Sequence, residues 1–288
     1  PQDIDGGYRS DYDVWLAGRT GGAVRDTAGT YSNNSWLALP WGGDESLHPN
    51  VWTVDAAIEL LQRRDPTRPF FLQVGFHRPH PPIDPPQRYF DAFASRALLP
   101  VPVGDWAAEF DVPVTDVEGA WRGHLPDSVL DRSRRGYYAQ IAHLDHQIGR
   151  LLWWLRKRRW LDETFVIFTS DHGEMLGDHH LFRKTVPFEG SAKAPLIVRP
   201  PRGAEGPRGA ACARPATHCD LMPTVLEAAG LPVPADVEGA SLLPLLAGRD
   251  LPWREFVHGE HTGQHGWQFV TDGREKFIWE SRSGREWF

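Results

Sequence analysis

The fold of this chain is decided by an apolar run that ends abruptly in polar residues, Phe165-Val166-Ile167-Phe168-Thr169-Ser170-Asp171-His172-Gly173-Glu174. Apolar residues followed by a polar cluster and a glycine predict a buried strand that stops at a sheet edge. In open α/β sheets, ligands bind beyond the carboxyl ends of the strands, so Asp171 and His172 emerge where chemistry is expected. A carboxylate beside an imidazole is also a pair of metal ligands. An aspartate that caps the turn beside a solvent-facing histidine would explain an isolated Asp-His-Gly equally well.

Strands and helices alternate on either side of this stretch. Apolar residues at helical spacing predict helices over residues 51–64, 134–159 and 220–229, the last of them capped by Asp220. On the helix over 134–159, the expected buried stripe is Ile141, Leu144, Ile148, Leu151, Leu152 and Leu155. Strands are predicted over residues 70–76, 164–170, 194–198 and 256–258, and a hairpin over 268–280 turns at Asp272-Gly273. Residues 1–50 and most of 79–128 read as loop.

This alternation predicts a large α/β domain over residues 1–262 and the beginning of a small C-terminal antiparallel sheet subdomain over 263–288. The 288 residues can bury a full core, and 41% hydrophobic with 24% charged residues is an ordinary globular composition. A net charge of −7 argues against a nucleic-acid-binding surface, which is normally basic. No apolar run approaches the roughly 20 residues of a membrane helix.

Four blocks, in order along the chain, resemble the sulfatase family of the alkaline phosphatase superfamily. They are FFLQVGFHRPHPP at 70–82, YYAQIAHLDHQIGRLL at 137–152, TSDHGEMLG with the segments after it at 169–198, and HCDLMPTVLEAAG at 218–230. The resemblance implies an alkaline-phosphatase-like sandwich, with a mostly parallel or mixed central sheet flanked by helices. It also implies hydrolysis of a sulfate ester, of the arylsulfatase or carbohydrate sulfatase type.

The nucleophile of that family is a cysteine oxidised to formylglycine in a Cys-x-Pro/Ser-x-Arg motif, preceded by an Asp-Asp metal pair. Neither feature occurs here, since Cys212 and Cys219 lie late in the chain and outside such a motif. We therefore expect an internal fragment of a longer enzyme, truncated at both ends and without sulfatase turnover by itself. A formylglycine-generating enzyme is the expected partner of the full-length protein. The localisation of the full-length protein is left open.

The resemblance assigns roles to several residues. Asp171 and His172 would be two ligands of one divalent cation, with Ca²⁺ expected and Mg²⁺, Mn²⁺ or Zn²⁺ as alternatives. Lys184 would neutralise charge on the sulfate as the ester bond breaks, and His80 would donate a hydrogen bond or a proton. Further contacts to a sulfated small molecule or carbohydrate are expected from Arg78, His179 and His261. An ordinary surface lysine and a loop histidine are the bland interpretations of Lys184 and His80.

Two other functions remain open at this point. One is a phosphonate monoester or phosphodiester hydrolase of the same superfamily, because Asp-His-Gly after a strand also occurs in its phosphoryl-transfer branches. The other is a catalytically inactive homologue used for binding. The presence of Asp171, His172, Lys184 and His80 argues against inactivity, because such costly polar residues are usually the first to be lost.

Overall fold

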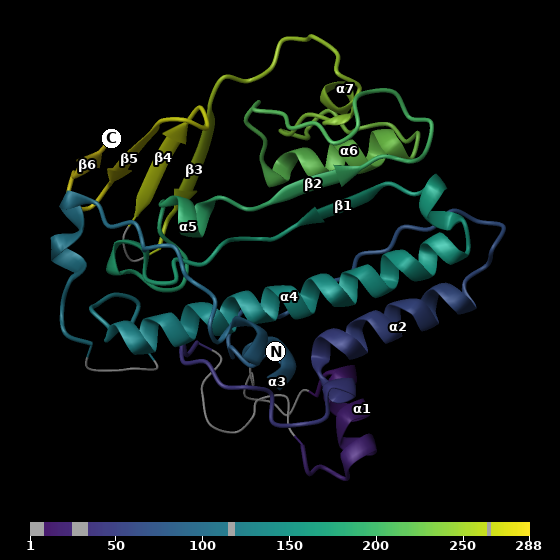
Figure 1. Ribbon diagram of the computed structural model, residues 1–288. Coiled ribbons are helices and arrows are strands. Elements are labelled where there is room, and N and C mark those ends of the chain that lie inside the picture. The colour runs from purple at the N-terminus through teal and green to yellow at the C-terminus, as the bar shows by residue number, and fades with distance from the viewer. Residues whose placement is uncertain (1–8, 25–33, 115–118, 264–265) are drawn as a thin grey trace. The chain divides into compact units, whose positions relative to one another are not determined.

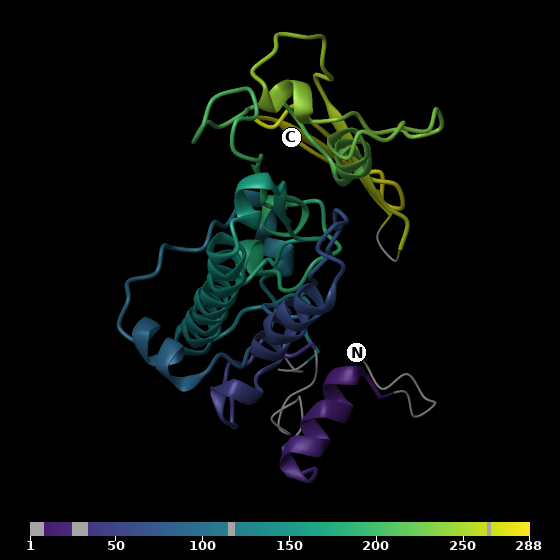
Figure 2. The same cartoon turned by 90° about the vertical axis from the view of Figure 1, so that its right-hand side faces the viewer.

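The computed structural model describes residues 9–24, 34–114, 119–263 and 266–288. The chain forms two compact units (Figures 1 and 2). The first unit runs to Arg159 and includes the later segment Met175–Arg183. The second unit consists of Trp160–Glu174 and Lys184–Phe288. None of the helices in the described segments is long and apolar enough to cross a membrane.

The first unit is helical. Its elements are α1 (Asp11–Thr20), η1 (Glu45–Leu47), α2 (Pro49–Arg63), α3 (Gln87–Phe93), η2 (Asp105–Phe110), α4 (Asp127–Lys157) and η4 (Asp178–His180). Both views show α2 running alongside α4 (Figures 1 and 2). The predicted helices over 51–64 and 134–159 are confirmed, although α4 begins seven residues earlier than predicted, at Asp127.

Helix α1 was not predicted, because its short sequence shows little apolar periodicity. Its first turn is fixed by a capping box, in which Ser10 and Asp13 exchange side-chain and backbone hydrogen bonds. Tyr12 holds the helix to the rest of the unit, donating a 2.7 Å hydrogen bond to the Leu47 carbonyl and packing on Trp52 with ring centroids 5.5 Å apart. Local capping and one aromatic anchor therefore replace the missing hydrophobic stripe.

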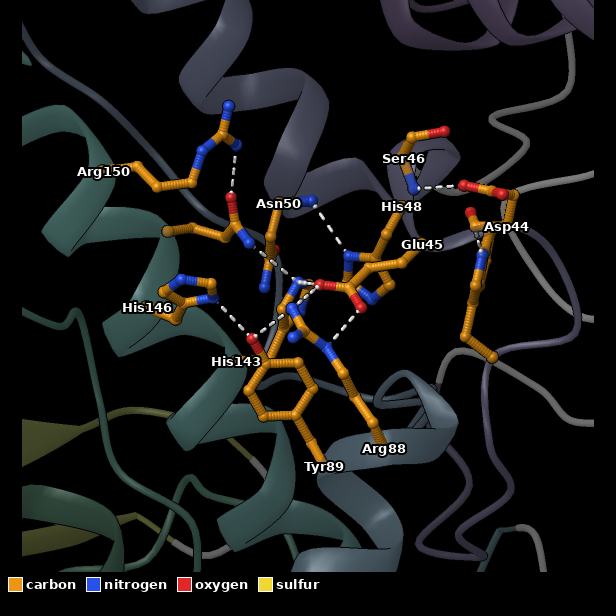
Figure 3. Close-up of polar contacts among 12 residues, drawn as sticks. Asp44, Glu45, Ser46, His48, Asn50, Arg88, Tyr89, His143, His146 and Arg150 are labelled. Atoms are coloured by element: carbon orange, nitrogen blue, oxygen red, sulfur yellow. Dashed lines mark hydrogen bonds and ion pairs between the residues drawn. The ribbon is translucent and has the colours of Figure 1, made fainter.

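The buried face of α4 mixes apolar and polar residues. Leu144, Leu151 and Leu155 of the predicted stripe are buried, but Ile141 is 42% exposed. The buried polar residues on the same helix include Gln140, His143 and Gln147. They make some hydrogen-bonding contacts inside the unit, such as the 3.0 Å bond from Gln140 Nε2 to the Pro82 carbonyl and the 3.2 Å contact between Gln147 Nε2 and His143 Nε2. Figure 3 shows the polar cluster around His143 between α2 and α4.

Every strand found among the described residues belongs to the second unit. Its elements are η3 (Trp160–Glu163), β1 (Val166–Thr169), α5 (Glu189–Ala192), β2 (Leu196–Arg199), η5 (His218–Asp220), α6 (Leu221–Ala228), α7 (Leu243–Leu246), β3 (Val257–His261), β4 (Trp267–Thr271), β5 (Lys276–Glu280) and β6 (Glu286–Trp287). β1 pairs with β2 in register Val166↔Arg199, and the order of the second sheet is β3-β4-β5-β6. The strands predicted over 164–170, 194–198 and 256–258 and the hairpin over 268–280 are confirmed.

One sequence expectation is corrected here. The segment 70–76 is not a strand, since no ladder joins it to the described residues, although its side chains alternate between exposed and half-buried. The alternating exposure of these side chains agrees with the prediction, but a strand also needs a hydrogen-bonded neighbour. The ladders of both described sheets are antiparallel, and the isolated bridges Ala38↔Ile83 and Pro113↔His124 are parallel. The predicted boundary at 262/263 stays a prediction, and β3, which precedes it, shares a sheet with β4.

Asp220 lies at the start of α6, but its side chain does not cap that helix as predicted. It accepts hydrogen bonds from the N–H groups of Thr217 (2.8 Å) and Ala240 (2.9 Å), and both of its oxygens are held by the Arg254 guanidinium at 2.5 and 2.7 Å. Asp220 thus joins three segments of the second unit. Sequence spacing gave no sign of the partner, because Arg254 lies 34 residues away.

Candidate functional site

The predicted metal pair lies where β1 ends, in the second unit. The N–H of His172 donates to Asp171 Oδ1 at 3.0 Å, and Nε2 of the same imidazole lies 3.6 Å from Asp171 Oδ2. His172 Nδ1 lies 2.8 Å from the Gly173 carbonyl, an acceptor that requires the proton to be on Nδ1. In the neutral ring this leaves the Nε2 lone pair on the side of the Asp171 carboxylate.

This arrangement fits a divalent cation. One oxygen and one nitrogen donor 3.6 Å apart can share an ion, because metal–ligand bonds of roughly 2.0–2.6 Å put neighbouring donors at about that separation. A backbone carbonyl on the other ring nitrogen is also the usual support of a metal-binding histidine. The Asp171 side chain is 88% exposed, so an ion from solvent can reach its carboxylate oxygens.

The backbone behind the pair is fixed by three hydrogen bonds within the unit. Ser170 Oγ donates to the His172 carbonyl at 2.9 Å, and the Gly173 N–H donates to the Ser191 carbonyl at 2.7 Å. His218 Nε2 lies 2.8 Å from the Ser170 carbonyl. His218 was not among the predicted site residues, although it opens one of the four quoted blocks. It acts on the site as a positioning residue, through the backbone of the strand exit.

The segment that accepts the hydrogen bond from the Gly173 N–H is itself bound to the C-terminal sheet. Glu189 at the start of α5 pairs with Lys276 of β5 at 2.5 Å and with Lys193 at 3.4 Å, and Lys276 also donates to the Pro187 carbonyl at 2.8 Å. Burial by itself raises the pKa of Glu189, but the two lysines bring it below its ordinary value. The carboxylate therefore stays ionised, and the sheet supports the segment next to the metal pair.

Lys184 is half-buried and stands between two residues with left-handed backbone, Arg183 (φ 70°) and Thr185 (φ 73°). Within the described ranges, five of the six non-glycine residues with positive φ fall between residues 176 and 185. Such conformations cost free energy and cluster at functional sites. The segment that carries Lys184 is thus conformationally unusual, which supports a functional reading of this lysine.

His80 belongs to the first unit. Its Nδ1 lies 2.9 Å from the Pro81 carbonyl, its ring is half-buried, and it lies 5.0 Å from the ring of His77. Arg78 is 1% exposed, and its guanidinium makes two hydrogen bonds to Asp84, at 3.0 and 2.8 Å. The predicted contact between Arg78 and substrate stays a prediction. The buried ion pair argues against this contact, because the Arg78 guanidinium is already paired with Asp84 inside the fold.

His179 and His261 have structural contacts of their own. His179 Nδ1 accepts a 3.0 Å hydrogen bond from the Gly104 N–H, and its ring lies 4.6 Å from that of Trp106. Burial, and then the neighbouring His180, lower the pKa of His179. His261, at the end of β3, accepts a 3.2 Å hydrogen bond from the Gly263 N–H and lines a small open hollow with Arg282. Their predicted contacts with substrate stay predictions.

The structure thus brings Asp171, His172 and His218 together in the second unit, which also carries Lys184 and His261. His80, Arg78 and His179 belong to the first unit. The predicted convergence of His80 with Lys184 and Asp171 stays a prediction.

Comparison with known proteins agrees with this description. A family model described as Sulfatase matches residues 26–231. An arylsulfatase from Clostridium perfringens is 39% identical over 96% of this chain and 58% of its own length. A phosphonate monoester hydrolase from Agrobacterium radiobacter is similar in structure, with a TM-score of 0.79 and 25% identity over 98% of this chain and 62% of that chain.

A protein solved in complex with its substrate D-glucosamine-2-N,6-O-disulfate has a TM-score of 0.70 and 23% identity over 83% of this chain and 62% of that chain. This likeness shows the fold. The chain spans 58% of the length of the Clostridium relative. The predicted alkaline-phosphatase-like α/β fold is confirmed, and the chain belongs to the sulfatase family of the alkaline phosphatase superfamily.

Proposed function

We propose that this chain supplies part of the active site of an enzyme that hydrolyses a sulfate ester of a small molecule or carbohydrate. The observation that carries the proposal is the Asp171–His172 pair at the exit of β1, with its donor atoms 3.6 Å apart and the imidazole oriented by the Gly173 carbonyl. The 39% identity to an arylsulfatase supports sulfate as the transferred group.

In this proposal Asp171 and His172 hold a divalent cation, for which Ca²⁺ is the first choice. When bound, such an ion supplies Lewis-acid stabilisation of the negative charge on the sulfate oxygens. The nucleophile is a formylglycine contributed by sequence outside these 288 residues and made by a formylglycine-generating enzyme. Neither cysteine of the chain stands in the required motif.

Lys184 and His80 assist the departure of the ester oxygen in this proposal. Hydrolysis breaks the bond between sulfur and the ester oxygen, so that R–O–SO₃⁻ and water become R–OH and hydrogen sulfate. The Lys184 ammonium offsets the charge that develops on the departing oxygen. The Pro81 carbonyl holds Nδ1–H of His80, so in the protonated ring Nε2–H delivers its proton to the departing oxygen, and the ring regains a proton from the water that is consumed.

The test compares two esters with the same leaving group, p-nitrophenyl sulfate and p-nitrophenyl phenylphosphonate, on the full-length protein. We expect a higher kcat/KM for the sulfate. Lys184→Met should lower kcat by on the order of 10²–10³, whereas Lys157→Met, at the end of α4, should leave it unchanged.

Phosphonate monoester hydrolysis is the second candidate, favoured by the similarity to the Agrobacterium enzyme. A higher kcat/KM for the phosphonate would replace the sulfatase proposal with this one. Metal-loaded protein that turns over neither ester would support the inactive, binding homologue instead.

A further inference from the structure

Three segments of the first unit are joined to one another by backbone hydrogen bonds. The His124 N–H donates to the Val112 carbonyl and the Gly123 N–H to the His180 carbonyl, both at 2.8 Å. The Phe182 N–H donates to the Trp121 carbonyl, also at 2.8 Å. Two isolated bridges, Pro113↔His124 and Arg122↔Leu181, run through the same region.

Each segment presents one metal-binding side chain at this junction. Asp111, His124 and His180 offer ligand atoms that all lie within 4.8 Å of one another. Asp111 Oδ1 and His124 Nδ1 are 3.3 Å apart, and the rings of His124 and His180 have centroids 6.0 Å apart. This group was not predicted, because its three members are spread over seventy residues.

The three ligand residues lie next to buried residues in the chain. Each is directly followed or preceded by a buried apolar residue: Phe110 is 5% exposed, Leu125 5% and Leu181 0%. Leu125 belongs to the hydrophobic cluster of the unit, together with Trp36 and Phe182.

Gly123 shows how closely the chains approach here. Its φ is +133°, and a Cβ atom on it would lie 2.7 Å from the Val112 carbonyl oxygen. The backbone hydrogen bonds and the close approach at Gly123 hold the segments that carry the ligands, while the ligand side chains can rotate towards an ion.

We propose that Asp111, His124 and His180 form a binding site for a transition-metal cation of the Zn²⁺ class, with a remaining position open to water. Two imidazoles and one carboxylate suit Zn²⁺, whereas Ca²⁺ and Mg²⁺ prefer oxygen ligands. Tetrahedral Zn²⁺ with bonds near 2.0–2.1 Å separates its ligands by about 3.3 Å. The Asp111–His124 pair already has that spacing, and His180, which is only partly buried, reaches it by rotation of its side chain.

This site shares no ligand with the Asp171–His172 pair and does not depend on the sulfatase proposal. A bound ion would clip the segment that follows η2 to the turn that carries His179 and His180. His179 already holds the Gly104 N–H ahead of η2. Because the ion would bind the folded chain and not the unfolded one, it would raise the thermal midpoint by an amount that increases with the logarithm of the free Zn²⁺ concentration above its Kd.

The experiment is a titration of the metal-stripped full-length protein with Zn²⁺, in an Asp171→Ala/His172→Ala background that removes the other pair of ligands. We expect one equivalent of Zn²⁺ to be retained through gel filtration and the thermal midpoint to rise by several degrees. His124→Ala and His180→Ala should each abolish both effects. His146→Ala is the matched control, since it removes an exposed histidine of the same unit and should change neither.

Circular dichroism of each variant establishes that it is folded, and His180→Gln provides a second, more conservative loss of the ligand. Co²⁺ in place of Zn²⁺ should give visible ligand-field bands that disappear in the same variants. Zn²⁺ retained at one equivalent in both His124→Ala and His180→Ala would overturn the site. So would a background protein that binds no Zn²⁺, which would leave Asp111 and His124 as a surface ion pair.

Discussion

Gly173 lies against the carbonyl group of Gly190 so closely that a Cβ atom on Gly173 would stand 2.1 Å from that oxygen. The contact brings the chain just after the metal pair onto the start of α5, where the Gly173 N–H bonds the Ser191 carbonyl. The glycine of Asp-His-Gly is therefore required by backbone packing. The direction in which Asp171 and His172 point depends on it.

We predict that Gly173→Ala destabilises the fold by about 1–3 kcal/mol, the usual cost of overpacking, because the obstructing atom belongs to the backbone. It should also weaken metal binding by displacing His172. Urea denaturation and metal content measure the two effects. Gly149→Ala on α4 is the control: a Cβ there meets nothing within 4 Å, so that substitution should stabilise by roughly 0.5–1 kcal/mol.

Asp171→Ala should remove the divalent metal and the turnover together, because a hard cation is held poorly by the remaining ligands. Metal content is best measured in a His124→Ala background, so that the proposed second site does not contribute. Asp250→Ala, which removes a fully exposed carboxylate, should keep both metal and activity. Stoichiometric metal in the Asp171→Ala protein would show that the assignment is wrong.

His80 and Lys184 should act on the same ester although they belong to different units. We expect each of His80→Asn and Lys184→Met to lower kcat/KM, and the double variant to lose less than the product of the two effects, since groups that act as a unit are not additive. Lys157→Met combined with His80→Asn should show simple multiplication. If the effects of the His80 and Lys184 substitutions on kcat/KM simply multiply, the predicted convergence of the two residues is contradicted.

The Asp220–Arg254 pair should be a major source of stability in the second unit. The Asp220 side chain is fully buried, so Arg254→Met leaves an uncompensated charge and should cost about 3–5 kcal/mol in the free energy of unfolding. Arg214→Met removes the partner of exposed Asp250 and should cost only about 0–1 kcal/mol. Equal losses in the free energy of unfolding of the two variants, measured by urea denaturation, would show that the buried pair contributes no more than the exposed one.

The same pair predicts sensitivity to acid. Burial by itself would raise the pKa of Asp220, but the hydrogen bonds from Arg254, Ala240 and Thr217 hold it below its ordinary value. The stability that this lowering contributes is present above the ordinary aspartate pKa and is lost as the pH falls through the folded-state pKa.

Two buried histidines of the first unit predict a second pH dependence (Figure 3). Burial, with the nearby charges of His143 and Arg78, holds the pKa of His48 well below its ordinary value. Burial lowers the pKa of His143 to about 4, against the opposing pull of Glu45. The unfolded chain therefore binds more protons, and the free energy of unfolding should fall as the pH drops from about 6.5 towards 4, by up to about 1.4 kcal/mol per pH unit for each histidine.

His143→Gln removes one of the two groups and should reduce that slope, whereas His146→Gln, an exposed histidine of the same helix, should keep it. Urea denaturation at a series of pH values gives the slope. A wild-type slope of zero between pH 4 and 6.5 would contradict the neutral, buried state of these rings.

Elements with a periodicity of their own could be predicted from the order of the amino acids. Apolar spacing located α2 and α4, and β-branched runs located β1 and β2, because burial of one face is encoded residue by residue. Asp272-Gly273 located the hairpin of β4 and β5, since that turn requires a positive φ, here 92° at Gly273. The adjacency of Asp171 and His172 also made the metal pair visible, because the two ligands are neighbours in the chain.

Contacts between residues far apart in the chain could not be predicted in this way. The partners of Asp220 and Arg78, the contact of Gly173 with Gly190, and the meeting of His180 with Asp111 each depend on segments that come together through backbone hydrogen bonding and burial. The segment over 70–76 has the alternation of a strand but no ladder to the described residues, because pairing requires a neighbour that no local pattern specifies. Local patterns encode which face of an element is buried; which residues meet is settled only when those faces pack together.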